Sequence, residues 1–263
     1  LLLLGFTACS NDDDDDKIGF EAGNAVQFES TIIEMSQART IDDNWTSGDE
    51  IGIYMVKSGT TLVMGDARNK KYTADVSGKL AAAGDAIYYP ADENVSVDFI
   101  AYYPYREALT NYSYDINLSD QSQQSKIALL YSNNVADAKN GNMPVKMQFS
   151  HKLTKLIFNI SPGAGLTESS LNNLKMYING MNTVADFNLA TGLISNAQKN
   201  ETITALTAAN GRQSQAIVLP VNDLMYSLEF VMSNNATFEW KMEKPVTFTE
   251  GKIYSFDVTI GAN

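Results

Sequence analysis

The sequence predicts an all-β protein with two antiparallel β-sandwich domains in tandem. Three observations carry this prediction: apolar and polar residues alternate along many short segments, Gly, Asn, Asp and Ser separate those segments, and helical periodicity is scarce. The chain has 263 residues with 44% hydrophobic content, which suffices for two domains of ordinary size. A Gly- and Asn-rich break at residues 140–144 divides them into 25–144 and 145–263.

The predicted strands follow one another along the whole chain after residue 24. In the first strand, Val26, Phe28 and Ile32 share one face. In the last strand, the shared face carries Tyr254, Phe256, Val258 and Ile260. Strands are also predicted at residues 51–55, 95–103, 112–118, 145–149, 156–160, 174–178, 217–219, 228–232 and 238–242. Residues 168–174 and 203–209 are each long enough for a helical turn or two.

Composition excludes several functional classes. The chain carries 19 Lys and Arg against 31 Asp and Glu, a net charge of −12, which argues against nucleic acid as a partner. One Cys cannot form an intrachain disulfide, and one His leaves little material for a transition-metal site. We therefore expect no metal, no cofactor and no enzymatic activity.

The first 24 residues read as a targeting segment. The apolar run that ends at Cys9 is too short to span a membrane, and because no Met precedes it, we expect the sequence to start inside a secretory signal. Residues 4–9 look like a bacterial lipobox, which would make Cys9 a site of lipidation by acyl chains such as palmitate. A conventional signal cut near Ala8 is the alternative.

Five consecutive aspartates, at residues 12–16, follow the lipobox. Charges this dense stay solvated, so we expect a flexible tether, with weak calcium binding as an alternative. The run also resembles the signal that sends lipoproteins of Bacteroidetes-type bacteria to the outer face of the outer membrane.

Residues that could carry chemistry are isolated. No nucleophile motif lies near His151 in the sequence, so we interpret it as a structural residue. Sequence alone leaves a glycosidase-like carboxylate pair open. The tyrosines at residues 88–105 could stack on sugars, although tyrosines in a sandwich more often pack in the core. Arg39 lies in a polar stretch after the first strand, where a protease would have access.

Five sequence segments together resemble the fimbrillin (Mfa-like) family of type V pilus proteins of Bacteroidales. They are Arg39 with the Trp45–Ile53 stretch, Ile87-Tyr88-Tyr89-Pro90, residues 97–105, Phe149-Ser150-His151-Lys152-Leu153 and Glu250-Gly251-Lys252-Ile253-Tyr254. Each is weak alone, but their order together with a lipobox is fairly specific. The resemblance covers almost the whole chain after residue 25.

The resemblance implies two transthyretin-like sandwich domains and a structural subunit that mediates cell adhesion. The lipidated precursor would reach the cell outer membrane, where an Arg-specific protease would cut between Arg39 and Thr40 and release the strand at residues 25–35. A strand from another pilus subunit, taken from around residues 254–260, would fill the vacant groove and build the fimbrium. The sequence ends three residues after Ile260. If the last strand is needed to complete its own C-terminal domain, little is left to donate, which would suit a terminal subunit or an anchor.

Two alternatives remain open from the sequence. One is a surface glycan-binding lipoprotein of a polysaccharide-uptake system, which would share the lipobox, the tether and the β-sandwich fold. The other is a carboxylate-based hydrolase.

Overall fold

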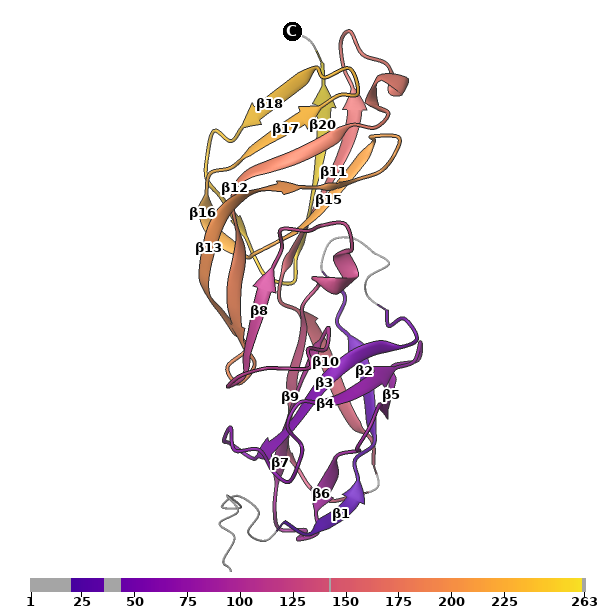
Figure 1. The fold of residues 1–263 in the computed structure, drawn as a ribbon, viewed down its shortest axis with the longest axis vertical. Helices are drawn as coiled ribbons and strands as arrows, with labels where there is room; N and C mark the ends of the chain where they lie inside the picture. Colours follow the sequence, from indigo (N-terminus) through magenta and orange to yellow (C-terminus); the bar gives the residue numbers. More distant parts are fainter. Residues whose placement is uncertain (1–19, 36–43, 142, 262–263) are drawn as a thin grey trace, which may run out of the picture.

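The computed structural model describes residues 20–35, 44–141 and 143–261. It confirms the all-β class, because strands dominate and the only helices described are two short 3-10 turns, η2 (Gln124–Lys126) and η3 (Glu168–Leu171). None of the described helices is long and apolar enough to cross a membrane. The molecule is elongated, with a barrel at one end and a sandwich at the other, and the C-terminus lies at the far end of the sandwich (Figure 1).

The N-terminal half forms a closed barrel, where the sequence predicted an antiparallel sandwich. In order around the barrel its strands are β10 (Val145–His151), β2 (Phe28–Ile32), β5 (Lys79–Ala82), β4 (Lys70–Ala74), β3 (Asp49–Lys57), β7 (Val97–Tyr103) and β9 (Leu130–Ala138). The β10–β2 pair is parallel, and the other neighbouring pairs are antiparallel. Closure leaves no free edge, which an open sandwich would have had. A separate two-stranded sheet, β1 (Ala22–Ala25) with β6 (Tyr88–Pro90), lies at the end of the barrel remote from the sandwich (Figure 1).

The C-terminal half is a sandwich of two sheets. The four-stranded sheet has the order β14 (Leu206–Thr207), β15 (Gln213–Val218), β11 (Thr154–Pro162) and β20 (Ile253–Ile260). The facing sheet has the order β13 (Leu193–Thr204), β12 (Lys175–Asn188), β17 (Ser227–Val231) and β18 (Thr237–Lys241). A short pair, β16 (Val221–Leu224) with β19 (Val246–Phe248), completes this half. β11 and β20 pair in parallel, which the antiparallel prediction did not include.

Strand pairing does not follow the boundary predicted between residues 144 and 145. β10 lies beyond that boundary in sequence but belongs to the barrel. β8 (Ser113–Asn117) lies before it, yet pairs with the C-terminal half of β12 in the sandwich sheet. The two halves are therefore interlocked, because each receives a strand from the other side of the predicted boundary.

Three apolar cores hold the molecule together. One fills the barrel and one fills the sandwich. The third lies between them and includes Tyr54, Tyr102, Tyr131 and Phe187. β3 contributes to two cores, since Ile53 faces the barrel and Tyr54 faces the junction. A strand covered on both faces is buried without interruption from Ile51 to Val56, so its pattern does not alternate.

Candidate strand-binding groove

The first part of the chain supplies one wall of the barrel. β2 pairs in parallel with β10 through five residue pairs, from Phe28 opposite Val145 to Ile32 opposite Phe149. On its other edge it pairs with β5 through only two, Phe28 with Leu80 and Glu29 with Lys79. β2 is thus enclosed by strands from two distant parts of the chain, and its seam with β5 is the weaker one.

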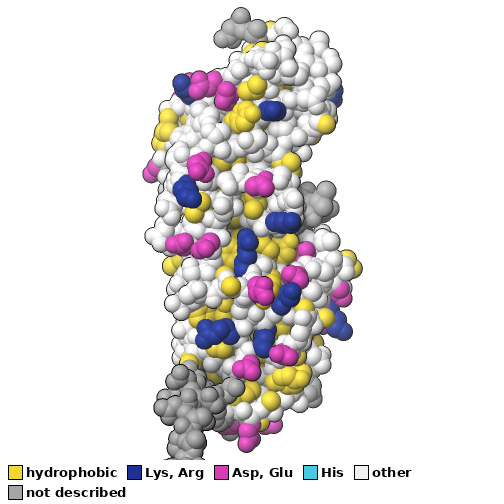
Figure 2. Space-filling model, viewed as in Figure 1, with side chains coloured by type: hydrophobic (Ala, Val, Ile, Leu, Met, Phe, Trp, Pro, Cys, Tyr) yellow, Lys and Arg dark blue, Asp and Glu magenta, His cyan; other side chains and the backbone are white. Residues whose placement is uncertain are grey.

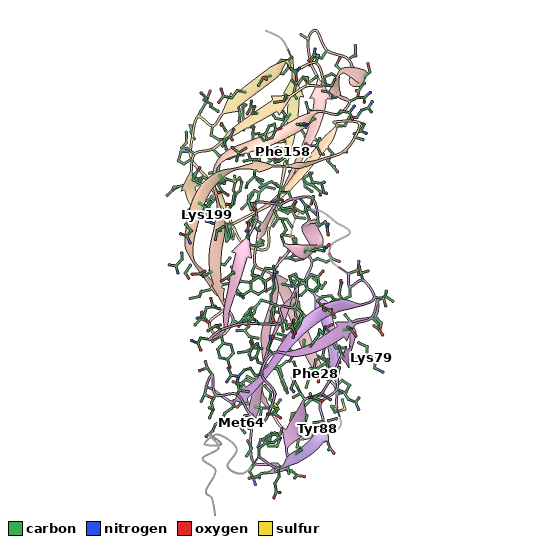
Figure 3. The ribbon with its side chains drawn as sticks, in the orientation of Figure 1. Phe28, Met64, Lys79, Tyr88, Phe158 and Lys199 are labelled. Atoms are coloured by element: carbon green, nitrogen blue, oxygen red, sulfur yellow. The ribbon has the colours of Figure 1, made fainter. Side chains whose placement is uncertain are left out.

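Phe28 is the main side chain that β2 contributes to the barrel core. It is 2% exposed, and its ring makes edge-to-face contacts with Tyr72 and Phe99, with centroids 5.2 and 5.1 Å apart. Figure 3 shows Phe28 within the barrel half of the molecule. Without this side chain the two facing rings would border an empty space in the core.

The predicted groove residues Val26 and Ile32 flank Phe28 on the same face. Val26 is buried, and its amide donates a hydrogen bond to the carbonyl of Ile87 at 2.8 Å. Ile32 is half-buried and packs against the barrel core. The intervening Glu29 and Thr31 are exposed, so the predicted alternation in this strand is present.

Ser30 marks a narrow point between β2 and the turn before β5. Its amide and its hydroxyl both donate to the carbonyl oxygen of Gly78, at 2.6 and 2.8 Å. A Cβ atom added at Gly78, where φ is +83°, would lie 2.0 Å from the backbone oxygen of Ser30. Neither residue was predicted as part of the site, because a glycine turn signal does not indicate a contact with a strand 48 residues away.

The rest of the groove wall is apolar. Its strands each pair with at least one strand other than β2, so these pairings would remain without β2. Tyr72, Leu80, Phe99, Met147 and Phe149 belong to this core. Burial raises the pKa of the Tyr72 hydroxyl, and the hydrogen bond from the Ile87 amide acts in the opposite direction. A pocket of 330 Å³ lies along the weak β2–β5 seam. Removal of β2 would therefore expose a long apolar groove with an unpaired β10 edge.

The predicted donor residues lie on β20, in the sandwich. Tyr254, Phe256 and Val258 are half-buried, and Ile260 is 3% exposed. β20 pairs with β11 through eight residue pairs, and Phe256 stacks on Phe158 with centroids 5.2 Å apart. No described strand pairs with the other edge of β20.

A second apolar groove runs along that free edge. It has a volume of 960 Å³ and lies between β20 and β18, which is the last strand of the facing sheet. Phe230, Phe238 and Trp240 line one side, and Trp240 is 46% exposed. The sandwich thus has a free strand edge at β20, whereas the barrel is closed.

The remaining predicted site residues, Cys9, Arg39 and Thr40, lie outside the described residues. The chain on either side of residues 36–43 is anchored. Met35 is buried at one end. At the other, Trp45 makes edge-to-face contacts with Phe149 at 5.1 Å and Tyr103 at 5.6 Å.

The geometry gives no support to the hydrolase alternative. Asp75, Asp98 and Asp120 each have a lowered pKa. For Asp98, burial acts to raise the pKa, but hydrogen bonds from Ser58, Gly59 and Asp137 outweigh it. A glycosidase acid needs the opposite shift. Among the described residues no three His, Cys, Asp or Glu side chains are grouped so as to hold a metal ion.

Most of the tyrosines at residues 88–105, which could have stacked on sugars, are not fully exposed. Tyr88 is 45% exposed, whereas Tyr89 and Tyr102 are buried and Tyr103 and Tyr105 are half-buried.

On the face shown in Figure 2, basic and acidic side chains are interspersed, with no basic patch. His151 is 8% exposed at the end of β10, where it pairs with Leu130 of β9.

Comparison with known proteins points to one family. The family model described as Fimbrillin-like matches residues 38–263. A Bacteroides uniformis protein that carries the name fimbrium subunit Fim1C is 31% identical over 247 residues, which cover 89% of this chain and 80% of that protein.

Solved structures agree with this result. One from Bacteroides uniformis, assigned as a cell adhesion protein, superposes with a TM-score of 0.76 at 30% identity and covers 90% of this chain and 93% of its own. Another from Bacteroides ovatus, also assigned to cell adhesion, has a TM-score of 0.73 at 24% identity over 91% and 93% of the two chains, and it supports the fold. The chain belongs to the fimbrillin-like family of fimbrial subunits and cell adhesion proteins, which form cell-surface appendages.

Proposed function

We propose that this protein is a non-enzymatic structural subunit of a fimbrium that mediates cell adhesion and is assembled by strand exchange. An Arg-specific protease cuts between Arg39 and Thr40, the segment that carries β1 and β2 leaves, and a strand from another pilus subunit enters the groove. The position of β2 carries the proposal: it closes the barrel, yet it comes from the N-terminal end of the chain.

The energetics of the groove support this order of events. While β2 is tethered to the barrel, its effective concentration is high and an incoming strand cannot compete. Once the link is cut, a partner strand can replace its main-chain hydrogen bonds and apolar contacts with similar ones. The family match begins at residue 38, so β1 and β2, which would be lost, lie outside the matched range.

The targeting segment completes the proposal. Lipidation of Cys9 would hold the precursor on the outer membrane, because acyl chains anchor a protein without a spanning segment. The aspartate run would tether it, and the cut at Arg39 would release the processed subunit from its anchor. The subunit would then belong to the fimbrium.

Limited digestion with an Arg-specific protease tests the cleavage. Arg68, Arg106 and Arg212 are exposed in the folded protein, so the protease has a choice of sites. We expect the first cut at Arg39, read by mass spectrometry of the fragments. Arg39→Lys keeps the charge and should abolish that cut. A first cut at any of the other three arginines would contradict the proposal.

Exchange of the released strand tests the assembly mechanism. After the cut, a fluorescently labelled peptide of residues 20–35 should replace the bound segment, followed by the rise in anisotropy. The uncut Arg39→Lys protein should not take up the peptide, because its own strand remains tethered. A cut protein that never exchanges would overturn strand exchange but leave the family assignment intact.

A further inference from the structure

We propose that the β2 groove selects its occupant by side-chain size, and that it therefore takes a strand from a different kind of subunit rather than from a second copy of this chain. The occupant needs a large aromatic residue at the Phe28 position and a small residue at the Ser30 position. This inference rests on the proposed strand exchange and specifies the partner.

The Phe28 position calls for an aromatic ring. The Phe28 ring makes near-perpendicular contacts with both Tyr72 and Phe99, with interplanar angles of 82° and 88°. An aliphatic side chain would lose both edge-to-face contacts and leave unfilled volume.

The Ser30 position calls for a small side chain. Ser30 is 4% exposed and lies against the Gly78 backbone, which its amide and hydroxyl both contact through the same carbonyl oxygen. The Ser30 hydroxyl oxygen lies 2.8 Å from the Gly78 carbonyl oxygen, which is a hydrogen-bond distance and too short for a methyl group in the same place. A branched side chain at this position would therefore crowd the Gly78 carbonyl.

The turn that forms this narrow point is held in place. The Asp75 carboxylate accepts hydrogen bonds from the Ser77 amide and hydroxyl and from the Lys79 amide, at 2.8, 2.6 and 3.0 Å. The Gly78 amide donates to the Asp75 carbonyl at 3.0 Å. A larger residue at position 30 would have to displace a turn with these bonds, so overpacking is costly.

The last strand of this chain does not match the required pattern. If Phe256 takes the Phe28 position, Val258 falls at the Ser30 position, where its side chain is too large and has no hydroxyl to donate to the Gly78 carbonyl. If Tyr254 takes the Phe28 position, Phe256 falls there instead. Neither register places a small residue at the narrow point.

β20 is also paired and packed within its own sandwich. Its eight pairs with β11 and the stack of Phe256 on Phe158 would be lost if it left. Two separate observations, the size mismatch and the internal pairing, thus exclude β20 as the natural occupant. The groove fits an extended segment of another subunit that runs parallel to β10 and carries an aromatic residue followed two positions later by Gly, Ala or Ser.

Peptide competition on the whole chain, nicked after residue 39, tests this inference. If the protease does not cut at Arg39, a recognition sequence for a site-specific protease inserted between residues 39 and 40 supplies the nick. The labelled peptide of residues 20–35 reports occupancy. Competitors are its Ser30→Ala, Ser30→Val and Phe28→Ala forms, a peptide of residues 250–261, and the Val258→Ser form of the latter.

We expect the Ser30→Ala peptide to compete nearly as well as the unchanged one, and the Ser30→Val peptide about tenfold or more weaker. The Phe28→Ala peptide should compete about a hundredfold or more weaker. The 250–261 peptide should compete poorly, and Val258→Ser should improve it about tenfold, because it then presents the aromatic and small pair.

The outcomes separate the two proposals. If the unchanged 20–35 peptide does not exchange, strand exchange itself fails. If it exchanges, and the Ser30→Val and 250–261 peptides compete equally well, size selection is overturned. If Val258→Ser brings no improvement, the narrow point is not what excludes β20.

Discussion

β2 and β20 lie near opposite ends of the chain, and the two strands have similar sequences but different surroundings. Both alternate apolar and polar residues, and both run parallel to one neighbour. β2 is enclosed by β10 and β5 in a closed barrel, whereas β20 is an edge strand beside an open groove. Removal of a strand that is paired on both edges leaves a groove with walls on two sides, whereas removal of an edge strand only widens a groove that is already open.

The contrast extends to single side chains. Phe28 is 2% exposed among rings that surround it, while Phe256 is half-buried and stacks on one ring at the border of the groove. Phe256 borders the 960 Å³ groove beside β20, whereas Phe28 borders only the smaller pocket of 330 Å³ along the β2–β5 seam. The energetic consequences of equivalent substitutions should therefore differ, and the following predictions rank them.

Phe28→Ala should have the largest effect. We expect it to lower the free energy of unfolding by about 3 to 5 kcal/mol, because it leaves a cavity beside Tyr72 and Phe99 and removes both ring contacts. Denaturant unfolding followed by circular dichroism measures this loss. Glu29→Ala, on the exposed face of the same strand, serves as the matched control and should change little. A loss below about 1 kcal/mol for Phe28→Ala would mean that β2 is not an integral wall of the barrel.

Gly78→Ala should come second. It combines a non-glycine residue at φ +83° with a Cβ 2.0 Å from the Ser30 oxygen, and we expect a loss of about 2 to 4 kcal/mol. Gly48→Ala is the control: φ is +94° there, but nothing lies within 4 Å of the added Cβ, so only the backbone penalty of about 1 to 2 kcal/mol applies. Hydrogen exchange should show faster opening of residues 28–32 in Gly78→Ala alone. Equal losses at both glycines would remove the evidence for a narrow point.

Phe256→Ala should have a smaller effect than Phe28→Ala. Because the site borders an open groove, water can fill the space, and we expect a loss of about 1 to 2 kcal/mol. Thr259→Ala, exposed on the same strand, is its control. If Phe256→Ala proved as destabilising as Phe28→Ala, the groove beside β20 would be closed in solution and the contrast between the two strands would fail.

The ion pair between Lys152 and Glu250 should have the smallest effect. It joins the two regions, since Lys152 follows β10 and Glu250 precedes β20, with nitrogen and oxygen 2.7 Å apart. The Lys152 side chain is 10% exposed and Glu250 is 49% exposed, so solvent screens the pair. A double-mutant cycle with Lys152→Ala and Glu250→Ala should give a coupling of about 0.5 to 1 kcal/mol that shrinks in high salt. A coupling insensitive to salt would point to packing instead of charge.

Local alternation was enough to locate many strands from the sequence. The strands predicted at residues 145–149 and 254–260 lie within β10 and β20, and the one predicted at residues 228–232 lies in β17 except for its last residue. The helical turn expected at residues 168–174 is present as η3. Residues 203–209, for which a helical turn was also expected, instead contain the end of β13 and the short strand β14. There, sheet pairing overrides the weak local preference.

The sequence by itself determined the all-β class and, through its motifs, the resemblance to a family, because both depend on the order of residues along the chain. Only the tertiary structure decided that β2 closes a barrel in parallel with β10, that β8 joins the opposite sheet, and that Ser30 meets Gly78. These features depend on contacts between residues far apart in the chain. Alternation fixes which side of a strand is apolar, but it does not specify which neighbour covers that side or how closely two backbones approach.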